Sequence, residues 1–277
     1  MALQTSGPIS LSDIATEFND TAPHSMSEFY GADSGIPSSG AIDISNFYGA
    51  SDLPDIQLVD TITYSVDSYG INNVGFPVNY SALSKQSGDI LILLHAQDSG
   101  DEYNGTSEAG WQIASTANID RVIFTRRYTS GSFTYLTQTG EGNYNGGDIA
   151  GIVASVRNGS LIGIKHSQSR YLGPRCPGFT NVQAGDVIVI GFCVDDQVNL
   201  PSAPSGFTLW ATSKNGVLNS GSSSGIAYKK YTSAVADTGS FSWSTPWTAT
   251  EPVNQVSFLF RKASPTTMTS TITTVAV

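Results

Sequence analysis

The sequence is poor in charge, and what charge it has is mostly negative. Charged residues make up 13% of the 277 positions, about half of the roughly 25% usual in soluble domains. Lys and Arg together number 13 against 23 Asp and Glu, which gives a net charge of −10. Because binding of phosphate backbones needs clustered basic side chains, this balance argues against nucleic acid as a partner.

Long hydrophobic runs are also missing. No stretch approaches the roughly 20 apolar residues of a membrane-spanning helix, so membrane insertion is not expected. The start, Met1 to Thr5, lacks the basic and apolar regions of a signal peptide. Two cysteines, Cys176 and Cys193, are too few for a disulfide framework, and reduced thiols are favoured over a bridge between them. Cys193 lies in an apolar run and is expected in the core.

Patterns typical of catalysis or metal binding are scarce. The histidines His24, His95 and His166 lack the spacing of metal ligands, so structural roles are expected. Acidic residues gather in two corresponding loops, at 98–102 and 195–196, where calcium is conceivable, but solvated loops are favoured because the spacing is not that of an EF-hand. No nucleophile elbow is present, and the facing carboxylates of a glycosidase cannot be recognised in a sequence. We therefore predict no enzyme, no cofactor and no bound metal.

A short phrase stands twice near the N-terminus. Ser27-Glu28-Phe29-Tyr30-Gly31-Ala32 returns as Ser45-Asn46-Phe47-Tyr48-Gly49-Ala50, and the segment 6–12 resembles the segment 39–45. Each copy has the composition of one helical turn, with a serine before it and a glycine after it. The sequence therefore predicts a duplicated unit of short capped turns over residues 1–53.

The ends of these turns have recognisable residues. Ser25 and Glu28 have the spacing of a capping box, and Ser45 is expected to cap the second turn. Gly31 and Gly49 stand where a helix ends at positive φ. A somewhat longer helix is expected from Ser12 to Phe18, with Ile14 and Phe18 on one face.

A segment of this size buries too little surface for a core of its own. Its aromatic side chains are therefore expected to pack either on the rest of the chain or on another subunit. The second alternative, an arm that docks the protein into an assembly, is favoured. The interface would then comprise Phe18, Phe29, Tyr30, Phe47 and Tyr48.

The same segment carries a family resemblance. Its pattern consists of Gly7-Pro8-Ile9-Ser10-Leu11-Ser12-Asp13-Ile14, Glu17-Phe18, Ser25-Met26-Ser27-Glu28-Phe29-Tyr30-Gly31 and Gly40-Ala41-Ile42-Asp43-Ile44-Ser45-Asn46-Phe47-Tyr48-Gly49. This pattern resembles the N-terminal module of structural proteins in tailed-phage virions, common in tail fibres and appendages of marine and aquatic phages. One departure is Asn19-Asp20, where the family more often has a glycine pair. The resemblance implies a virion component assembled in the host cytoplasm, docked to other virion proteins and homo-oligomeric, with a trimer favoured.

After a hinge at Ser51 to Pro54 the sequence is typical of strands and turns. Thr61 to Val66 alternates polar and apolar residues, the period of a half-buried strand. Gly88 to Leu94 is a turn followed by a continuous apolar run, which indicates a strand buried on both faces. The strand from Ile149 to Arg157 ends at Asn158-Gly159, a type I′ turn signal.

Landmarks of this region recur in one order. Gly88-Asp89 returns as Gly185-Asp186, 97 positions later. The other corresponding segments are Gly110-Trp111 and Gly206-Phe207, 126–130 and 229–233, 131–135 and 239–243, and the strands that end at Arg157 and Arg261.

This duplication predicts an all-β fold of two tandem, jelly-roll-like β-sandwich units behind the N-terminal arm, over 54–159 and 160–264. One larger sandwich made of two similar halves is the alternative. The landmarks also resemble jelly-roll-like domains of phage appendage proteins. The strand-like tail at 265–277 is expected to pair with another strand, and a strand of a neighbouring subunit is one alternative.

Exposed aromatic residues suggest a site for host-surface glycan. The candidates are Trp111, Trp210, Trp247 and Tyr103, whereas Trp243 lies in an alternating strand and is expected in the core. The favoured function is a structural component of a phage particle, a tail fibre, tail tip or appendage that presents its sandwiches to the host surface. The alternatives are a capsid decoration (cement) protein and a polysaccharide-acting spike domain.

Overall fold

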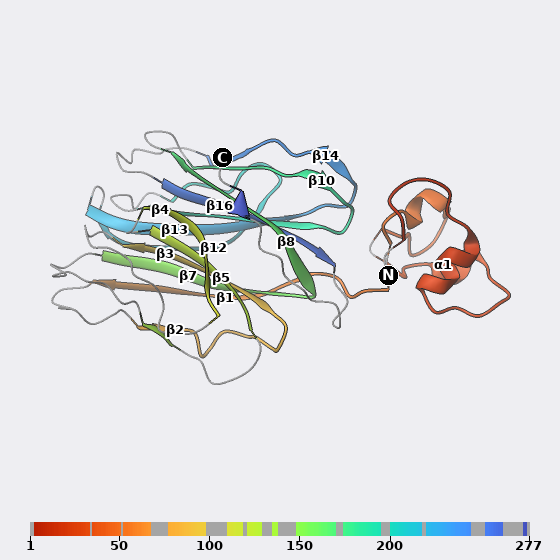
Figure 1. Ribbon diagram of the computed structural model, residues 1–277, viewed down its shortest axis with the longest axis horizontal. Coiled ribbons are helices and arrows are strands. Elements are labelled where there is room, and N and C mark those ends of the chain that lie inside the picture. Colours follow the sequence, from red (N-terminus) through yellow and green to blue (C-terminus); the bar gives the residue numbers. More distant parts are fainter. Residues whose placement is uncertain are drawn as a thin grey trace.

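The computed structural model describes residues 3–33, 35–50, 52–67, 77–97, 110–118, 121–128, 135–137, 148–169, 174–194, 200–217, 220–244, 253–262 and 274–275. Among these described residues, strands dominate from residue 57 onward, and helical turns occur in the first 50 residues alone. The prediction of an all-β chain preceded by short helical turns is thus confirmed. In Figure 1 the N-terminal part lies apart from the strands and is joined to them by one extended segment.

Three capped helical turns make up the N-terminal module, defined here as residues 3–52. They are the α-helix α1 (Leu11–Glu17) and the 3₁₀ helices η1 (Met26–Phe29) and η2 (Ile44–Phe47). Each begins with a complete capping box, formed by Ser10 with Asp13, Ser25 with Glu28, and Asp43 with Asn46. Each box satisfies backbone N–H groups that have no partner inside the helix.

The cap of η2 differs from the prediction. Asp43, not Ser45, occupies the capping position, because Asp43 is extended and its carboxylate accepts a hydrogen bond from the backbone N–H of Ser45 at 2.8 Å. Gly31 and Gly49 end the two 3₁₀ turns at φ +69° and +73°, as expected. Asn19, where the resembling modules more often have glycine, also has a positive φ of +55°, a conformation that Asn tolerates better than most residues.

The module has its own hydrophobic core, so the expectation that this segment lacks one is wrong. Phe29 and Phe47 are 3% and 0% exposed, and their rings meet edge to face with centroids 6.0 Å apart, a favourable geometry for aromatic pairs. The two ends of the module also meet, since Leu3 N–H donates to the Ala50 carbonyl at 2.9 Å. The core residues are Ile9, Ile14, Ala15, Phe29, Ile36, Phe47 and Ala50.

Two large sheets form the rest of the described chain. The first sheet has the order β1 (Gln57–Asp67), β7 (Asp148–Arg157), β3 (Ile90–Gln97), β5 (Arg121–Arg127) and β4 (Gln112–Asn118). The second has the order β12 (Thr208–Val217), β13 (Ser220–Lys230), β11 (Val187–Val194), β16 (Val253–Lys262), β8 (Gly159–Ser169) and β17 (Thr274–Val275). All neighbours are antiparallel except β17, which pairs in parallel with β8.

The duplication is visible in the strand order. If β1 corresponds to β8, β7 to β16, β3 to β11, β5 to β13 and β4 to β12, the two sheets have the same order. Each predicted unit therefore supplies one large sheet. The inner faces share one core, which includes Ile92 and Ile152 of the first sheet and Val189 and Phe258 of the second.

This arrangement differs from two tandem sandwiches. The alternative, one larger sandwich built from two similar halves, describes the packing of these strands. Asn158, at φ +58°, lies between β7 and β8, so it carries the chain from one sheet to the other and does not close a hairpin. In the described tail, Thr274 pairs with Ile164 of the same chain.

Short strands cover the outer faces. β2 (Pro77–Asn79) pairs with β6 (Tyr135–Thr137), and a second cluster of buried residues, including Val78, Leu91 and Val153, lies on the outer side of the first sheet. The outer side of the second sheet has a cluster that includes Ile190 and Trp243. It is accompanied by β9 (Arg175–Cys176) with β15 (Phe241–Ser242) and by β10 (Thr180–Val182) with β14 (Val235–Asp237).

Candidate functional site: the N-terminal module and its junction with the sandwich

Four of the five aromatic residues of the predicted interface lie in or against the core of the module itself, and the fifth, Tyr30, is half-buried elsewhere in the module. Phe29 packs against Phe18, with ring centroids 5.8 Å apart, and against Phe47. Because Phe29 and Phe47 are almost fully buried, they cannot contact a partner directly in this conformation. The prediction is corrected for these two residues, whose role is to hold the module together.

Tyr30 and Tyr48 are half-buried, and each ties its copy of the phrase to the glycine at the start of the other repeat's similar segment, 39–45 or 6–12. The Tyr48 hydroxyl donates to the Gly7 carbonyl at 2.7 Å, and the Tyr30 hydroxyl donates to the Gly40 carbonyl. Gly7 and Gly40 occupy corresponding positions in the similar segments 6–12 and 39–45 and have φ of +91° and +90°. The duplicated phrase thus builds two matching contacts, and Tyr30, Tyr48 and Phe18 keep part of their surface exposed.

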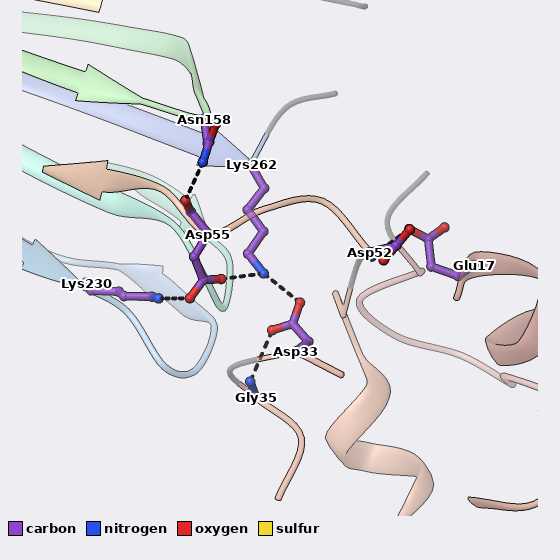
Figure 2. Close-up of polar contacts among 8 residues, drawn as sticks. All are labelled: Glu17, Asp33, Gly35, Asp52, Asp55, Asn158, Lys230 and Lys262. Carbon is purple, nitrogen blue, oxygen red and sulfur yellow. Dashed lines mark hydrogen bonds and ion pairs between the residues drawn. The ribbon is translucent and has the colours of Figure 1, made fainter. Parts of the chain in front are cut away.

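A network of four charged side chains joins the module to the sandwich (Figure 2). Lys262, the last residue of β16, lies 2.6 Å from Asp33 of the module and 2.8 Å from Asp55 of the connecting segment. Lys230, the last residue of β13, lies 2.6 Å from the other oxygen of Asp55. Two strand ends of the second sheet therefore hold both the module and its connection.

Burial makes the inner pair of this network different from a surface salt bridge. The side chains of Lys262 and Asp33 are 8% and 7% exposed, whereas those of Lys230 and Asp55 are 34% and 41% exposed. Surface pairs contribute little because water and salt screen them. The Lys262–Asp33 pair is shielded, so losing one partner would leave the other charge buried without compensation.

The pKa values follow the same geometry. Desolvation disfavours the charged form of Asp55, but hydrogen bonds from Lys230 and Lys262 outweigh it and hold the pKa of Asp55 below its usual value. For Lys262 desolvation likewise acts against the charge, and hydrogen bonds to Asp33 and Asp55 outweigh it and raise its pKa. Asp55 and Lys262 are therefore both charged at neutral pH.

Further hydrogen bonds fix the two ends of the connecting segment. Asn158 Nδ2 donates to the Asp55 carbonyl at 3.1 Å, which anchors the segment where the chain crosses between the sheets. On the module side, the backbone N–H of Asp52 donates to Glu17 Oε1 at 3.3 Å, and Asn19 Nδ2 donates to Asp52 Oδ2 at 3.3 Å. Figure 2 shows the Asp52–Glu17 and Asp55–Asn158 contacts on either side of the network.

A cavity of about 170 Å³ lies between the module and the second sheet, lined on one side by Tyr48 and Gly49 and on the other by Gly185, Lys230 and Tyr231. Its lining includes hydroxyl, amide and charged groups but no paired nucleophile and base of the kind used in covalent catalysis. The arrangement is suited to holding two bodies in one orientation.

Of the four aromatic residues predicted to bind glycan, the structure describes Trp111 and Trp210, which lie in different parts of the sandwich. Trp111 is half-buried against Tyr80 on the outer side of the first sheet. Trp210 is half-buried against Tyr228 and packs on the central core. Trp247 and Tyr103 lie outside the described residues, so only the two packed tryptophans can be placed.

Two of the three histidines, His24 and His95, have side-chain partners in the described part of the chain. His24 lies 2.9 Å from Asp20, and buried His95 lies 2.7 Å from the Tyr64 hydroxyl. The Tyr64 ring reaches His95 across Gly151, where a Cβ would come within 2.1 Å of the ring. Among the residues that the structure describes, no three His, Cys, Asp or Glu side chains are grouped to hold a metal. The two acidic loops at 98–102 and 195–196 lie outside the described residues.

Both cysteines are free thiols and are buried. Cys193 belongs to the central core, as expected. Burial raises the pKa of Cys176 to about 12, so this thiol is protonated and unreactive at neutral pH. Within the described part of the chain, no helix is long and apolar enough to cross a membrane.

The charged residues of the junction were not among the residues singled out from the sequence. Asp33 and Lys262 are 229 positions apart, so no local pattern connects them. One available signal was the duplication in the sequence. It identifies Lys230 and Lys262 as the ends of strands that correspond to the strands ending near Arg127 and Asn158. No protein-family model, no curated protein and no solved structure matches this chain.

Proposed function

We propose that this protein is a structural component of a tailed-phage particle and forms part of a tail fibre, tail tip or appendage. In this proposal the N-terminal module docks the chain to other virion proteins, and the sandwich is presented outward. The resemblance of the duplicated phrase to the N-terminal modules of virion proteins supports the assignment to a tailed-phage particle. The chain would act as a homo-oligomer, with a trimer favoured, and without catalytic activity.

The observation that carries the proposal is the self-contained module at one end of the molecule. It has its own core, its ends are closed by backbone hydrogen bonds, and one segment connects it to the sandwich (Figure 1). A small folded unit held by charged contacts is suited to docking, because it can bind a partner without disturbing the larger core. The docking surface would then be the outside of the module, including the exposed parts of Phe18, Tyr30 and Tyr48.

The charged junction would hold the module in a fixed orientation relative to the sandwich. The shielded Lys262–Asp33 pair and the two contacts of Asp55 set how the module lies on the ends of β13 and β16. A docking unit with a fixed orientation would direct the sandwich away from the particle. This geometry supports presentation toward the host surface.

Electron microscopy of labelled particles tests the proposal. Gold-labelled antibody against the sandwich, added to purified particles of the phage that encodes the chain, is expected to mark the tail. Label over the capsid shell would favour the decoration-protein alternative, and its absence from particles would overturn the proposal. Release of reducing sugar from host polysaccharide by the purified chain would favour the spike-enzyme alternative.

A further inference from the structure

A second cavity, of about 230 Å³, lies beside the end of β5, between the first sheet and β8. Its polar lining comes from Gln112, Thr125, Arg126 and Arg127, and its apolar lining includes Leu161. Ile90 and Gly110 complete the lining. It is distinct from the junction, because none of these residues belongs to the module or to the charged network.

Arg127 is unusual among the described cations. Its guanidinium makes no hydrogen bond or ion pair in the part of the chain that the structure describes, and its Nη2 atom is buried with no acceptor. Burial lowers the pKa of Arg127, yet an arginine keeps its charge in a protein. A partly buried cation without a counter-ion is unfavourable, and an anion that enters beside it would relieve that cost.

The duplicated half shows what this position holds when it has a partner. Arg127 pairs in register with Ile90 of β3, and Lys230 pairs in the same way with Val187 of β11, so the two cations occupy corresponding positions. Lys230 lies 2.6 Å from the carboxylate of Asp55. The first sheet thus has the cation and a cavity where the second sheet has a cation and a carboxylate.

We propose that the Arg127 cavity binds a small carboxylate-bearing molecule of the size of a sugar acid. A guanidinium matches a carboxylate with two parallel hydrogen bonds. Gln112 and Thr125 supply further polar groups, and Leu161 supplies an apolar wall. Since a cavity of about 150 Å³ can hold a benzene ring, the cavity of about 230 Å³ has room for the carboxylate and part of the ring that carries it. The proposal does not depend on whether the chain belongs to a virion.

Calorimetric titration of the full chain with D-glucuronate tests this site. D-glucose has the same ring without the carboxylate, and the native chain is expected to bind it at least about tenfold more weakly than glucuronate. The Arg127→Gln variant is expected to bind glucuronate at least about tenfold more weakly than the native chain does. Lys214→Gln removes an exposed cation of β12 and serves as the matched control, with unchanged affinity. Acetate carries the carboxylate without the sugar ring. The native chain is expected to bind acetate more weakly than glucuronate, and this binding is expected to be lost in Arg127→Gln.

Three results would overturn the proposal. They are no binding of glucuronate, equal binding by Arg127→Gln and the native chain, and binding of inorganic phosphate as tight as that of glucuronate. Circular dichroism checks that Arg127→Gln is folded. If it is not, Gln112→Ala changes an exposed side chain of the same cavity, and unchanged glucuronate affinity in that variant would count against the site.

Discussion

The Asp89 carboxylate accepts two hydrogen bonds from the Arg157 guanidinium, both at 3.0 Å. Asp186 accepts the corresponding two from Arg261, at 2.9 and 2.8 Å. Each aspartate is 1% exposed. Each pair fastens the turn before a central strand to the end of the neighbouring strand, so the duplicated sequence repeats an ion pair with a buried carboxylate as well as a fold.

Replacing one partner of these pairs should destabilise the sandwich strongly. We expect Asp186→Ala and Asp89→Ala each to lower the free energy of unfolding by about 2–4 kcal/mol, because the Gln183 or Gln86 backbone N–H loses its acceptor and the partly exposed arginine loses its partner. Urea denaturation measures the loss. Asp237→Ala removes an exposed aspartate and should cost less than about 1 kcal/mol. Similar small losses in all three variants would contradict a stabilising role for the two pairs.

The core of the module predicts a local effect of Phe47→Ala. Removing a fully buried phenylalanine costs about 3–5 kcal/mol, which is enough to unfold a unit as small as the module. Hydrogen exchange should show loss of protection in the module, with the strands of both sheets unchanged. Ser38→Ala, at an exposed position of the module, is the control. Full protection of the module in Phe47→Ala would mean that its core does not depend on this ring.

The junction should depend on pH in a defined window. A carboxyl group whose folded pKa lies below the unfolded value of 3.8 stabilises the contact above that value, and the stabilisation is lost as the pH falls through the folded pKa. For Lys262, whose pKa is raised from 10.5, the contribution is present below that value and is lost as the pH rises through the folded pKa. The junction is therefore expected to hold from about pH 4 to pH 10.

Lys262→Gln tests the same junction at neutral pH. The variant leaves Asp33 without its cation, so the module should separate from the strand ends while the sandwich stays folded. Small-angle X-ray scattering should record a larger maximum dimension than for the native chain at pH 7. Lys214→Gln should leave the scattering curve unchanged. A native curve for Lys262→Gln would show that the connecting segment alone orients the module.

The buried thiols give a chemical prediction. Because the pKa of Cys176 is raised to about 12, almost no thiolate forms at pH 8, and reaction with an aromatic disulfide reagent should require unfolding. The reagent is expected to modify both cysteines in guanidinium chloride and neither in buffer. Rapid reaction of one thiol in buffer would contradict the buried placement.

The local features of this fold could be predicted from the sequence because they depend on neighbouring residues. The capping box of Ser25 with Glu28, the glycine stops at Gly31 and Gly49 and the buried strand after Asp89 are all short-range patterns. The landmarks that recur between the two halves also indicated which strands correspond.

The rest depends on contacts between distant residues. A repeated sequence does not reveal whether each copy folds as its own sandwich or supplies one sheet to a shared core, since both choices bury the same apolar residues. Nor does it reveal that Phe29 and Phe47 meet each other inside the module. The Lys262–Asp33 pair joins positions 229 residues apart, and only the packing of the module on the strand ends brings them together.

Incorporation of a shortened chain into particles tests the central claim most directly. The chain without residues 1–52 and the full-length Lys262→Gln variant would each be produced during phage infection in place of the native protein. Immunoblots of purified particles then give the number of copies per particle. The account predicts that the shortened chain is folded but absent from particles, whereas Lys262→Gln, which keeps the module, is incorporated. Incorporation of the shortened chain at the native level would contradict docking through the module.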